Sequence, residues 1–357
     1  MSANNTQTEH DVAKEKQSPT PAKPTMATWK KMTIAGVSLA LIVGLSVGLG
    51  VGLTRHKGDG DDDGHKNNSS GISGVNGTNV DLNITGRPSR WTPKVGDSWQ
   101  IVLKNTIRSD AEFSPDVAVW DFDAYENNKE TIDKLHSLGK KVICYFSAGT
   151  WEKGRGDSDD FPPEDLGGTL PEWKDERWAR ISSQKVRDIM KKRIAVAASK
   201  GCDAIDPDNV DGFQNAENNL GLTAQDSIDY MHFLHDEANK YNMSVGLKNA
   251  GDIIDDVMSV VDFSVNEQCA ANQKDPECET FHKFIDAGKP VFHIEYPPDD
   301  DAKTYPDDRR KAICSRQGVN KGSDKFSTVF KRMNLDGWVQ FCNGDIFETA
   351  LAPTDSK

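Results

Sequence analysis

The sequence predicts an α/β fold, a (β/α)8 barrel of the TIM type, and three observations support this prediction. Short apolar runs have the length of buried strands, helix-like stretches such as Lys185–Lys200 and Ala224–Asn242 separate many of them, and polar or acidic residues follow them. Strands that alternate with helices pair in parallel. Eight such units form a closed barrel whose strand C-termini carry the chemistry. The eight runs are Trp99–Leu103, Val117–Trp120, Lys141–Phe146, Cys202–Ile205, Ser244–Leu247, Phe263–Val265, Pro290–Ile294 and Gly337–Val339.

The length and charge of the chain limit the classes of partner. Its 357 residues are enough for a barrel of roughly 250 residues and an additional segment. The net charge of −13 argues against nucleic acid and favours a neutral or cationic partner. The same acidity would also keep a secreted protein soluble. We expect no organic cofactor and no metal.

Four segments are predicted along the chain. Residues 1–32 are polar and rich in Lys, Thr and Pro, which predicts a disordered cytoplasmic tail. Thr33–Leu53 is a charge-free apolar run of 21 residues, long enough to span a bilayer, and it predicts a transmembrane signal anchor. We expect residues 54–90 to form a flexible glycosylated stalk and residues 91–357 to form the barrel. Small residues recur at every fourth position of the span and would allow a homodimer; they are Gly36, Ala40, Gly44, Gly48 and Gly52.

The orientation of this span follows from its C-terminal side. Lysine and arginine are nearly balanced across it, so the positive-inside rule barely discriminates. Five N-x-S/T sequons follow the span, at Asn67, Asn68, Asn76, Asn83 and Asn242. We therefore expect a single-pass type II protein of the cell membrane with an extracellular barrel.

Six cysteines fit an oxidising compartment. Their spacing lacks the paired C-x2-C of a zinc site. We expect Cys269 to pair with Cys278 and Cys314 with Cys342, and we expect Cys144 and Cys202, on strands, to be buried thiols instead, although six cysteines allow fifteen connectivities.

A dense acidic block follows the fourth run. Residues 203–211 hold four carboxylates, including Asp206 and Asp208. Such density costs repulsion unless protons, cations or hydrogen-bond donors are shared. The block does not match an EF-hand calcium loop that starts at Asp206, because such a loop needs Asp or Asn where the chain has Val210 and Gly where it has Asp211. A looser cation site, a structural turn, and a catalytic or substrate-binding site remain open, and we favour the last.

A second carboxylate faces this block across the predicted barrel. Glu267 follows the sixth run, and strands four and six are next-but-one neighbours. Glycosidic cleavage needs two carboxyl groups on either side of the scissile bond. We therefore predict Asp208 as nucleophile, with Asp206 as the alternative, and Glu267 as the acid/base, its pKa raised by a partly apolar site.

Other polar and aromatic residues at strand ends are candidates for sugar binding. Aromatic rings stack on sugar faces, and polar groups bind hydroxyls or amines. These candidates are Asp121, Asp123, Tyr145, Trp151, Arg155, Asp157, Asn209, Lys248, Asn249, Glu295, Tyr296, Trp338 and Gln340.

The order of these motifs resembles glycoside hydrolase family 114, the endo-α-1,4-polygalactosaminidases, from about Trp91 to Cys342. The N-terminal anchor resembles that of fungal members held at the cell surface. The motifs are Val142–Asp157, Asp206-Pro207-Asp208-Asn209, Gly246–Ala250, Asn266–Cys269 and Phe292–Tyr296.

The resemblance implies an endo-acting hydrolase of cationic or partly acetylated α-1,4-galactosamine polymers, of the galactosaminogalactan type. It implies an Asp after strand four and a Glu after strand six as the catalytic pair, and a retaining mechanism. It favours Asp208 through the spacing from Asp203. We expect Asp121, Asp123 or Glu295 to recognise the 2-amino group. Two alternatives remain: a hydrolase of another α-galactoside or N-acetylgalactosaminide linkage, and a non-catalytic carbohydrate-binding protein.

Overall fold

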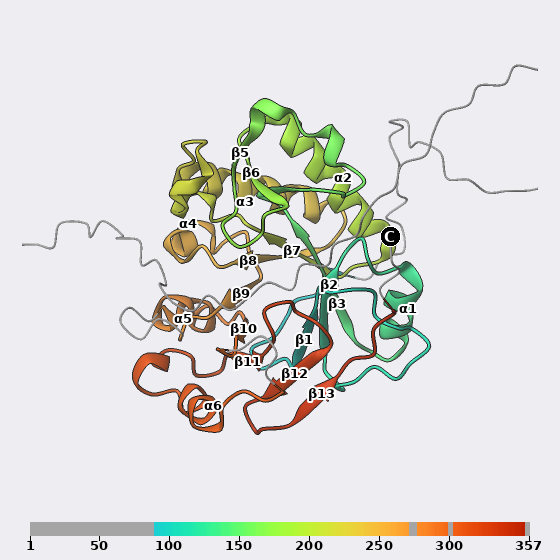
Figure 1. The fold of residues 1–357 in the computed structure, drawn as a ribbon, viewed down its shortest axis with the longest axis vertical. Coiled ribbons are helices and arrows are strands. Elements are labelled where there is room, and N and C mark those ends of the chain that lie inside the picture. Colours follow the sequence, from blue (N-terminus) through green and yellow to red (C-terminus); the bar gives the residue numbers. More distant parts are fainter. Residues whose placement is uncertain (1–88, 271–276, 299–302, 354–357) are drawn as a thin grey trace, which may run out of the picture. The chain divides into compact units, whose positions relative to one another are not determined.

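The computed structural model describes residues 89–270, 277–298 and 303–353, and eight parallel strands form the centre of this part. Each strand pairs with the next in the series. Figure 1 shows the strands in the middle and the helices around them. The strands are β1 (Trp99–Val102), β2 (Val119–Asp123), β3 (Lys141–Ser147), β7 (Ala204–Asp208), β8 (Ser244–Lys248), β9 (Phe263–Glu267), β10 (Val291–Glu295) and β11 (Ser327–Phe330).

The helices begin and end at residues with clear capping chemistry. The side chain of Asn128 accepts the Thr131 N–H at the start of α1, and Thr223 forms a capping box with Asp226 before α3. Helix α2 ends at Gly201, whose φ of 100° suits glycine. The α-helices are α1 (Lys129–Ser137), α2 (Gln184–Lys200), α3 (Ala224–Asn239), α4 (Ile254–Val257), α5 (Cys278–Asp286) and α6 (Asp307–Cys314). Short 3-10 helices are η1 (Ser158–Asp160), η2 (Pro163–Asp165), η3 (Gly212–Gln214), η4 (Ala216–Asn218), η5 (Gly251–Ile253) and η6 (Gly318–Asn320).

The sequence prediction of the eighth parallel strand was wrong. The run Gly337–Val339 overlaps β12 (Trp338–Phe341), which is antiparallel to β11 and pairs in turn with β13 (Ile346–Glu348). The eighth parallel strand is β11, where Ser327 and Thr328 interrupt the apolar pattern. Apolar runs indicate strands but not their direction.

The sheet curls, so that its first and eighth parallel strands approach each other. The indole N–H of Trp99 donates to the Ser327 carbonyl oxygen at 2.7 Å, and the Ser327 hydroxyl donates to the Asp97 carbonyl oxygen at 2.7 Å. No backbone ladder joins β1 to β11 in the described part of the chain. The predicted closed barrel is thus observed as a curled parallel α/β sheet whose two edges meet through side chains.

Alternation along the strands separates an inner face from an outer one. The inner face carries an apolar cluster, whose members include Trp99, Ile101, Val119, Ile143, Ala204, Phe263, Val265, Phe292, Ile294 and Val329. Side chains of alternate residues point to the same face. The inner face continues with polar residues two or four positions further along the same strands. Asp206 and Asp208 follow Ala204 in this way, and Glu267 follows Val265. The inner face therefore changes from apolar to polar toward the strand C-termini.

An insert between β3 and α2 forms a second, three-stranded antiparallel sheet. Its strands are β4 (Thr150–Glu152), β5 (Leu166–Thr169) and β6 (Glu176–Ala179), in the order β4-β6-β5. The insert is tied to the end of β7, because the N–H groups of Ala148 and Gly149 donate to the Asp208 carbonyl oxygen at 2.9 and 3.0 Å. The sequence did not reveal these three strands.

Three disulfides connect the six cysteines. Cys269–Cys278 and Cys314–Cys342 confirm the two predicted pairs. Cys144 and Cys202 are not buried thiols, because they form the third disulfide, between β3 and the residues before β7. The bond therefore joins two neighbouring strands that carry Tyr145 and Asp208.

The predicted cytoplasmic tail, the span Thr33–Leu53 with its small-residue stripe, and most of the stalk lie outside the described residues. Within the described ranges, no helix combines the length and hydropathy needed to cross a bilayer.

Gly149 allows the insert to approach β7. A Cβ atom at this position would lie 1.7 Å from the Asn209 carbonyl oxygen, whereas one at Gly156 would meet nothing within 4 Å. We expect Gly149→Ala to lower the free energy of unfolding by about 1–3 kcal/mol, measured by denaturant unfolding. Gly156→Ala is the control and should match the parent. Equal stability of both variants would contradict the close approach of Gly149 to β7.

Candidate active site

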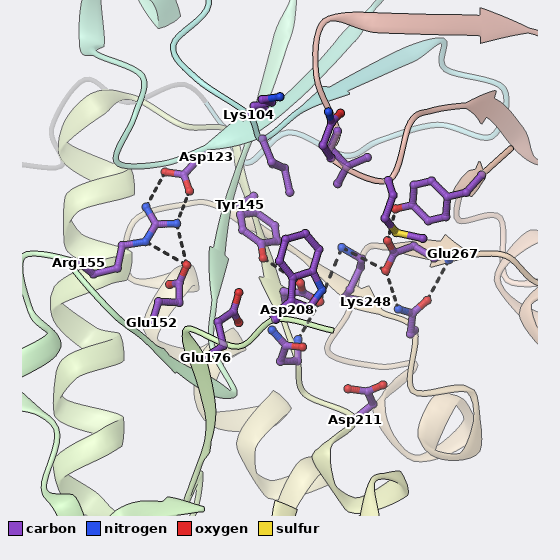
Figure 2. Close-up of a pocket in the computed structure, with 18 residues that line it drawn as sticks. Lys104, Asp123, Tyr145, Glu152, Arg155, Glu176, Asp208, Asp211, Lys248 and Glu267 are labelled. Carbon is purple, nitrogen blue, oxygen red and sulfur yellow. Dashed lines mark hydrogen bonds and ion pairs between the residues drawn. The ribbon is translucent and has the colours of Figure 1, made fainter. Parts of the chain in front are cut away.

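A cavity of about 490 Å³ opens at the C-terminal ends of the parallel strands. Nine of the predicted site residues line it: Asp123, Tyr145, Arg155, Asp208, Asn209, Lys248, Asn249, Glu267 and Tyr296. Figure 2 shows these side chains, most of which come from β2, β3, β7, β8 and β9 or from the residues that follow them. This location is the one at which parallel α/β barrels place their chemistry.

Lys248 lies among three carboxylates at the base of the cavity. Its side chain is only 2% exposed, and its Nζ lies 3.6 Å from Asp208 Oδ1 and 3.7 Å from both Asp206 Oδ2 and Glu267 Oε2. Burial lowers the lysine pKa, but the surrounding carboxylates more than offset this and raise it overall. The cation beside Asp206 and Asp208 of the acidic block is thus an ammonium group of the chain itself.

Asp208 is held by groups that donate to its two oxygens. The Tyr145 hydroxyl donates to Oδ2 at 2.9 Å, and the Asn209 N–H donates to Oδ1 at 2.8 Å. Its side chain is 19% exposed. Asp208 therefore combines a fixed orientation with access to the cavity.

Glu267 is held in the same way. Asn249 Nδ2 donates to Glu267 Oε2 at 2.9 Å, the Glu267 N–H donates to Asn249 Oδ1 at 2.9 Å, and the Tyr296 hydroxyl donates to Oε1. Burial would raise the pKa of Glu267, but Lys248 and these donors hold it below its usual value. The expectation of a raised pKa was therefore wrong for this structure.

Asp206 and Asp121 lie beneath the cavity and do not line it. Both side chains are fully buried, and their oxygens accept no hydrogen bond from another described residue. Burial raises the pKa of both groups, that of Asp206 to about 7. Repulsion acts in the same direction, from Asp206 and Asp208 on Asp121 and from Asp208 and Glu267 on Asp206, whereas Lys248 lowers the pKa of both groups.

The turns after three strands have left-handed backbone. Asn209 follows β7 with φ of 62°, Asn249 follows β8 with φ of 48°, and Gln268 follows β9 with φ of 60°. Asparagine tolerates this region better than most residues. The turns change the direction of the chain directly after Asp208, Lys248 and Glu267. The amide side chain of Asn249 then donates to Glu267, and that of Asn209 donates to the Ser147 hydroxyl at 3.0 Å.

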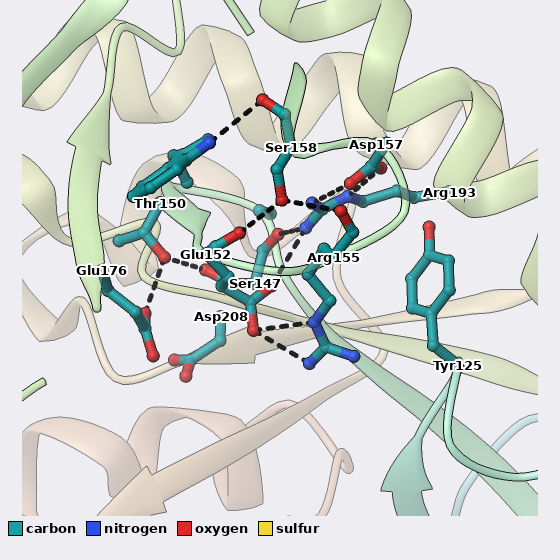
Figure 3. A network of polar contacts seen from close by, with 12 residues as sticks. Tyr125, Ser147, Thr150, Glu152, Arg155, Asp157, Ser158, Glu176, Arg193 and Asp208 are labelled. Atoms are coloured by element: carbon teal, nitrogen blue, oxygen red, sulfur yellow. Dashed lines mark hydrogen bonds and ion pairs between the residues drawn. The ribbon is translucent and has the colours of Figure 1, made fainter. Parts of the chain in front are cut away.

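A network of arginines closes one side of the site (Figure 3). Arg155 donates to Asp123 at 3.1 Å and to Glu152 at 2.8 Å. Arg193, fully buried, donates to both oxygens of Asp157 at 2.8 Å and lies 3.3 Å from Glu152. Asp157 therefore holds Arg193 and does not line the cavity, while Asp123 faces the cavity with its charge already paired.

Four further candidates lie away from the cavity lining. The indole N–H of Trp151 donates to the Ser158 carbonyl oxygen at 3.0 Å, and that of Trp338 donates to the Lys303 carbonyl oxygen at 3.2 Å. Gln340 accepts the Tyr305 N–H at 2.6 Å. Glu295 is buried and accepts the Ala270 N–H at 2.9 Å, with His293 Nε2 at 3.0 Å. Each is used within the fold.

Nine lining residues were not among the predicted site residues. They are Leu103, Lys104, Glu152, Trp173, Glu176, Asp211, Met333, Asn334 and Leu335. Glu152 lies inside the motif recognised in the sequence, and Asp211 inside the acidic block. The others follow β1, follow β11 or belong to the unpredicted insert, and no local motif distinguishes them.

One group of described residues has the composition of a metal site. Ligand atoms of Cys269, Cys278 and His293 lie within 4.8 Å of one another. Both sulfur atoms belong to a disulfide, so they are not the thiolates that metals prefer.

Replacing Lys248 tests the electrostatic balance of the cavity. Lys248→Met leaves three carboxylates without their cation, and we expect a loss of about 3–5 kcal/mol in the free energy of unfolding at pH 7. The loss should shrink as the pH falls, because protonated carboxyl groups need no cation. Denaturant unfolding from pH 4 to 8 measures both values. The surface lysine Lys240 supplies the control Lys240→Met, and a pH-independent loss would contradict the argument.

Comparison with known proteins agrees with this geometry. The family model of glycoside-hydrolase family GH114 matches residues 82–347. The crystal structure of Aspergillus fumigatus Ega3 in complex with galactosamine is 46% identical, with a TM-score of 0.66, and the match covers 71% of this chain and 98% of that one. A variant of the glycoside hydrolase domain of Pseudomonas aeruginosa PelA is 14% identical, with a TM-score of 0.51 and coverage of 67% and 95%, which concerns the fold alone. No curated protein matches. The chain belongs to glycoside-hydrolase family GH114 and is a glycoside hydrolase.

Proposed function

We propose that this glycoside hydrolase cleaves internal linkages of α-1,4-linked galactosamine polymers, using Asp208 and Glu267. The observation that carries the proposal is the placement of two oriented carboxylates on one buried ammonium group at the base of the cavity. Ega3, which was crystallised with galactosamine, is 46% identical to this chain and supports the sugar class. Six of the lining residues are acidic, which favours a cationic polymer.

Asp208 acts as the nucleophile and Glu267 as the acid/base in this proposal. Asp208 Oδ1 and Glu267 Oε2 lie 3.6 and 3.7 Å from the same Nζ, so these two oxygens are separated by no more than the sum of those distances. This limit accommodates the separation of about 5–5.5 Å typical of retaining enzymes. For these two oxygens it lies below the longer part of the inverting range of about 6.5–9.5 Å, which supports a retaining mechanism. Asp206 is too deeply buried to reach a sugar and serves beneath Lys248.

Protonation of Glu267 accompanies binding of the sugar. Its side chain is 25% exposed, and its pKa lies below the usual value because Lys248 and its hydrogen-bond donors outweigh burial. A sugar ring over Glu267 removes the remaining water, which favours the neutral carboxyl group. The neutral form then donates its proton to the glycosidic oxygen as Asp208 attacks the anomeric carbon.

Release of reducing ends from partly de-acetylated α-1,4-galactosamine polymer tests the function and the two roles. We expect the parent protein to be active, and Glu267→Gln and Asp208→Asn to lose on the order of 10²–10⁴-fold in rate. Glu279→Gln and Asp229→Asn, on exposed helix positions, are the controls and should keep full activity. Activity that survives Asp208→Asn but not Asp206→Asn would exchange the roles. Binding without cleavage by the parent would indicate a carbohydrate-binding protein.

We also propose that residues 33–53 anchor the enzyme in the cell membrane, with its catalytic domain outside and the small-residue stripe available for a homodimer. The apolar run and the sequons after it support this. Ile42→Lys together with Leu45→Lys should release the chain from membranes at alkaline pH, because each central lysine costs about 2.5–3.5 kcal/mol in a bilayer. The control, Ile42→Leu with Leu45→Ile, should remain bound, and its glycans should be removable by a peptide N-glycosidase. A full chain that is extracted as a soluble protein would contradict the anchor.

A further inference from the structure

We propose that Glu176 and Asp211 form the ammonium-recognition site of the cavity, with Trp173 as the platform for the same sugar. This inference rests on the proposed function and assigns the residues that distinguish a free 2-amino group from an acetylated one.

The six acidic residues of the cavity lining differ in how they are neutralised. Asp123 and Glu152 are paired with Arg155, and Asp208 and Glu267 are paired with Lys248. In the described part of the chain, neither Glu176 nor Asp211 lies within ion-pair distance of a basic group. These two carboxyl groups are therefore the ones left to accept a cation from the substrate.

Glu176 is positioned for this contact, and among the described residues only one of its two carboxylate oxygens accepts a hydrogen bond. The Thr150 hydroxyl donates to its Oε2 at 2.9 Å, which orients the carboxyl group and leaves Oε1 unassigned. Figures 2 and 3 both show Glu176 beside Asp208. Burial raises its pKa to about 7, and the charges of Glu152 and Asp208 act in the same direction. A bound ammonium group would relieve this unfavourable environment.

Asp211 lies on another side of Asp208 in Figure 2. It follows β7 and the Asn209 turn, and it lines the same cavity. Burial raises its pKa to about 7, and Asp208 adds to the effect by repulsion. Two carboxyl groups flanking the proposed nucleophile can hold the amino groups of sugar residues close to the scissile bond.

Trp173 supplies the apolar surface that an amino sugar also needs. Its side chain is 49% exposed, although it lines the cavity. The Glu176 N–H donates to the Trp173 carbonyl oxygen at 3.0 Å, which makes them the first and last residues of one turn. A sugar stacked on the indole ring therefore lies near Glu176.

This assignment replaces the expectation that Asp121, Asp123 or Glu295 recognises the amine. Asp121 is buried beneath the cavity, Asp123 is paired with Arg155, and Glu295 is buried against His293. None of the three offers an unpaired oxygen to the cavity.

The variant Glu176→Gln tests the proposal, because it keeps the shape and the acceptor for Thr150 but loses the charge. The probes are oligomers of α-1,4-galactosamine of equal length, one fully de-acetylated and one fully acetylated. We expect binding of the de-acetylated oligomer to weaken about 10- to 100-fold, as for loss of one charged hydrogen bond. Binding of the acetylated oligomer should stay within about twofold. Asp211→Asn should show the same selectivity, and Trp173→Ala should weaken both oligomers.

Two further readings separate recognition from a general effect of charge or fold. Glu172→Gln removes the same charge from an exposed neighbouring position that does not line the cavity, and it should leave both affinities unchanged. At pH 6 the parent should show proton release on binding the de-acetylated oligomer relative to the acetylated one, because an ammonium group displaces the proton of Glu176 while the proton uptake at Glu267 is common to both oligomers. Calorimetry in buffers of different ionisation enthalpy measures this release, which Glu176→Gln should reduce.

Equal weakening of both oligomers by Glu176→Gln, or unchanged proton release, would overturn the assignment. A parent protein that binds the de-acetylated oligomer selectively but fails to cleave it would overturn the proposed catalysis while leaving the recognition site intact. A parent that cleaves the polymer, with affinities unaffected by Glu176→Gln and Asp211→Asn, would overturn the recognition site and leave the proposed catalysis intact.

Discussion

The buried ammonium group of Lys248 is the interaction on which the site depends. Asp206, Asp208 and Glu267 come from two strands on either side of β8, and each lies within 3.7 Å of Lys248 Nζ. Without a cation, their burial would force protons onto them. With it, the pKa of Glu267 stays below its usual value, and hydrogen bonds orient both Asp208 and Glu267, while burial raises the pKa of Asp206 and Asp121 underneath. One lysine therefore supplies the positive charge beside three carboxyl groups.

Strand alternation explains which predicted residues reach the cavity. Asp121 and Asp123 on β2, and Asp206 and Asp208 on β7, each form a pair two residues apart on the inner face, the second member nearer the C-terminal end. The upper member of each pair lines the cavity and the lower one is buried. Glu295 shares its strand with the inner-facing Ile294, so its side chain falls on the outer face. A shift of one position along a strand therefore moves a side chain from the face that leads to the cavity to the face that is used within the fold.

Much of this arrangement could be predicted from the sequence, because alternation and strand-end chemistry are local properties. Seven strands, two disulfides and nine lining residues followed from such patterns. The charge state of Glu267 did not, because it depends on Lys248 and Tyr296, which no local pattern joins to it. Extending the predicted strands through Asp123 and Asp208 would have shown the pairing of inner positions. The eighth parallel strand and the insert stayed hidden because Ser327, Thr328 and the glycines of β5 dilute the apolar signal.

The insert and the parallel strands contribute different residues to the cavity. The strands β7, β8 and β9 hold the carboxylates and lysine, whose geometry is fixed by hydrogen bonds on both sides. The insert contributes Glu152, Trp173 and Glu176, and it is held to β7 through Gly149, where a side chain has no room. If Glu176 and Trp173 recognise the amino sugar as proposed, a substitution of either side chain alters which sugar is recognised while leaving the hydrogen bonds of Asp208 and Glu267 in place. Because Glu152 is already paired with Arg155 and Arg193, the carboxyl group of the insert on which this recognition depends is Glu176.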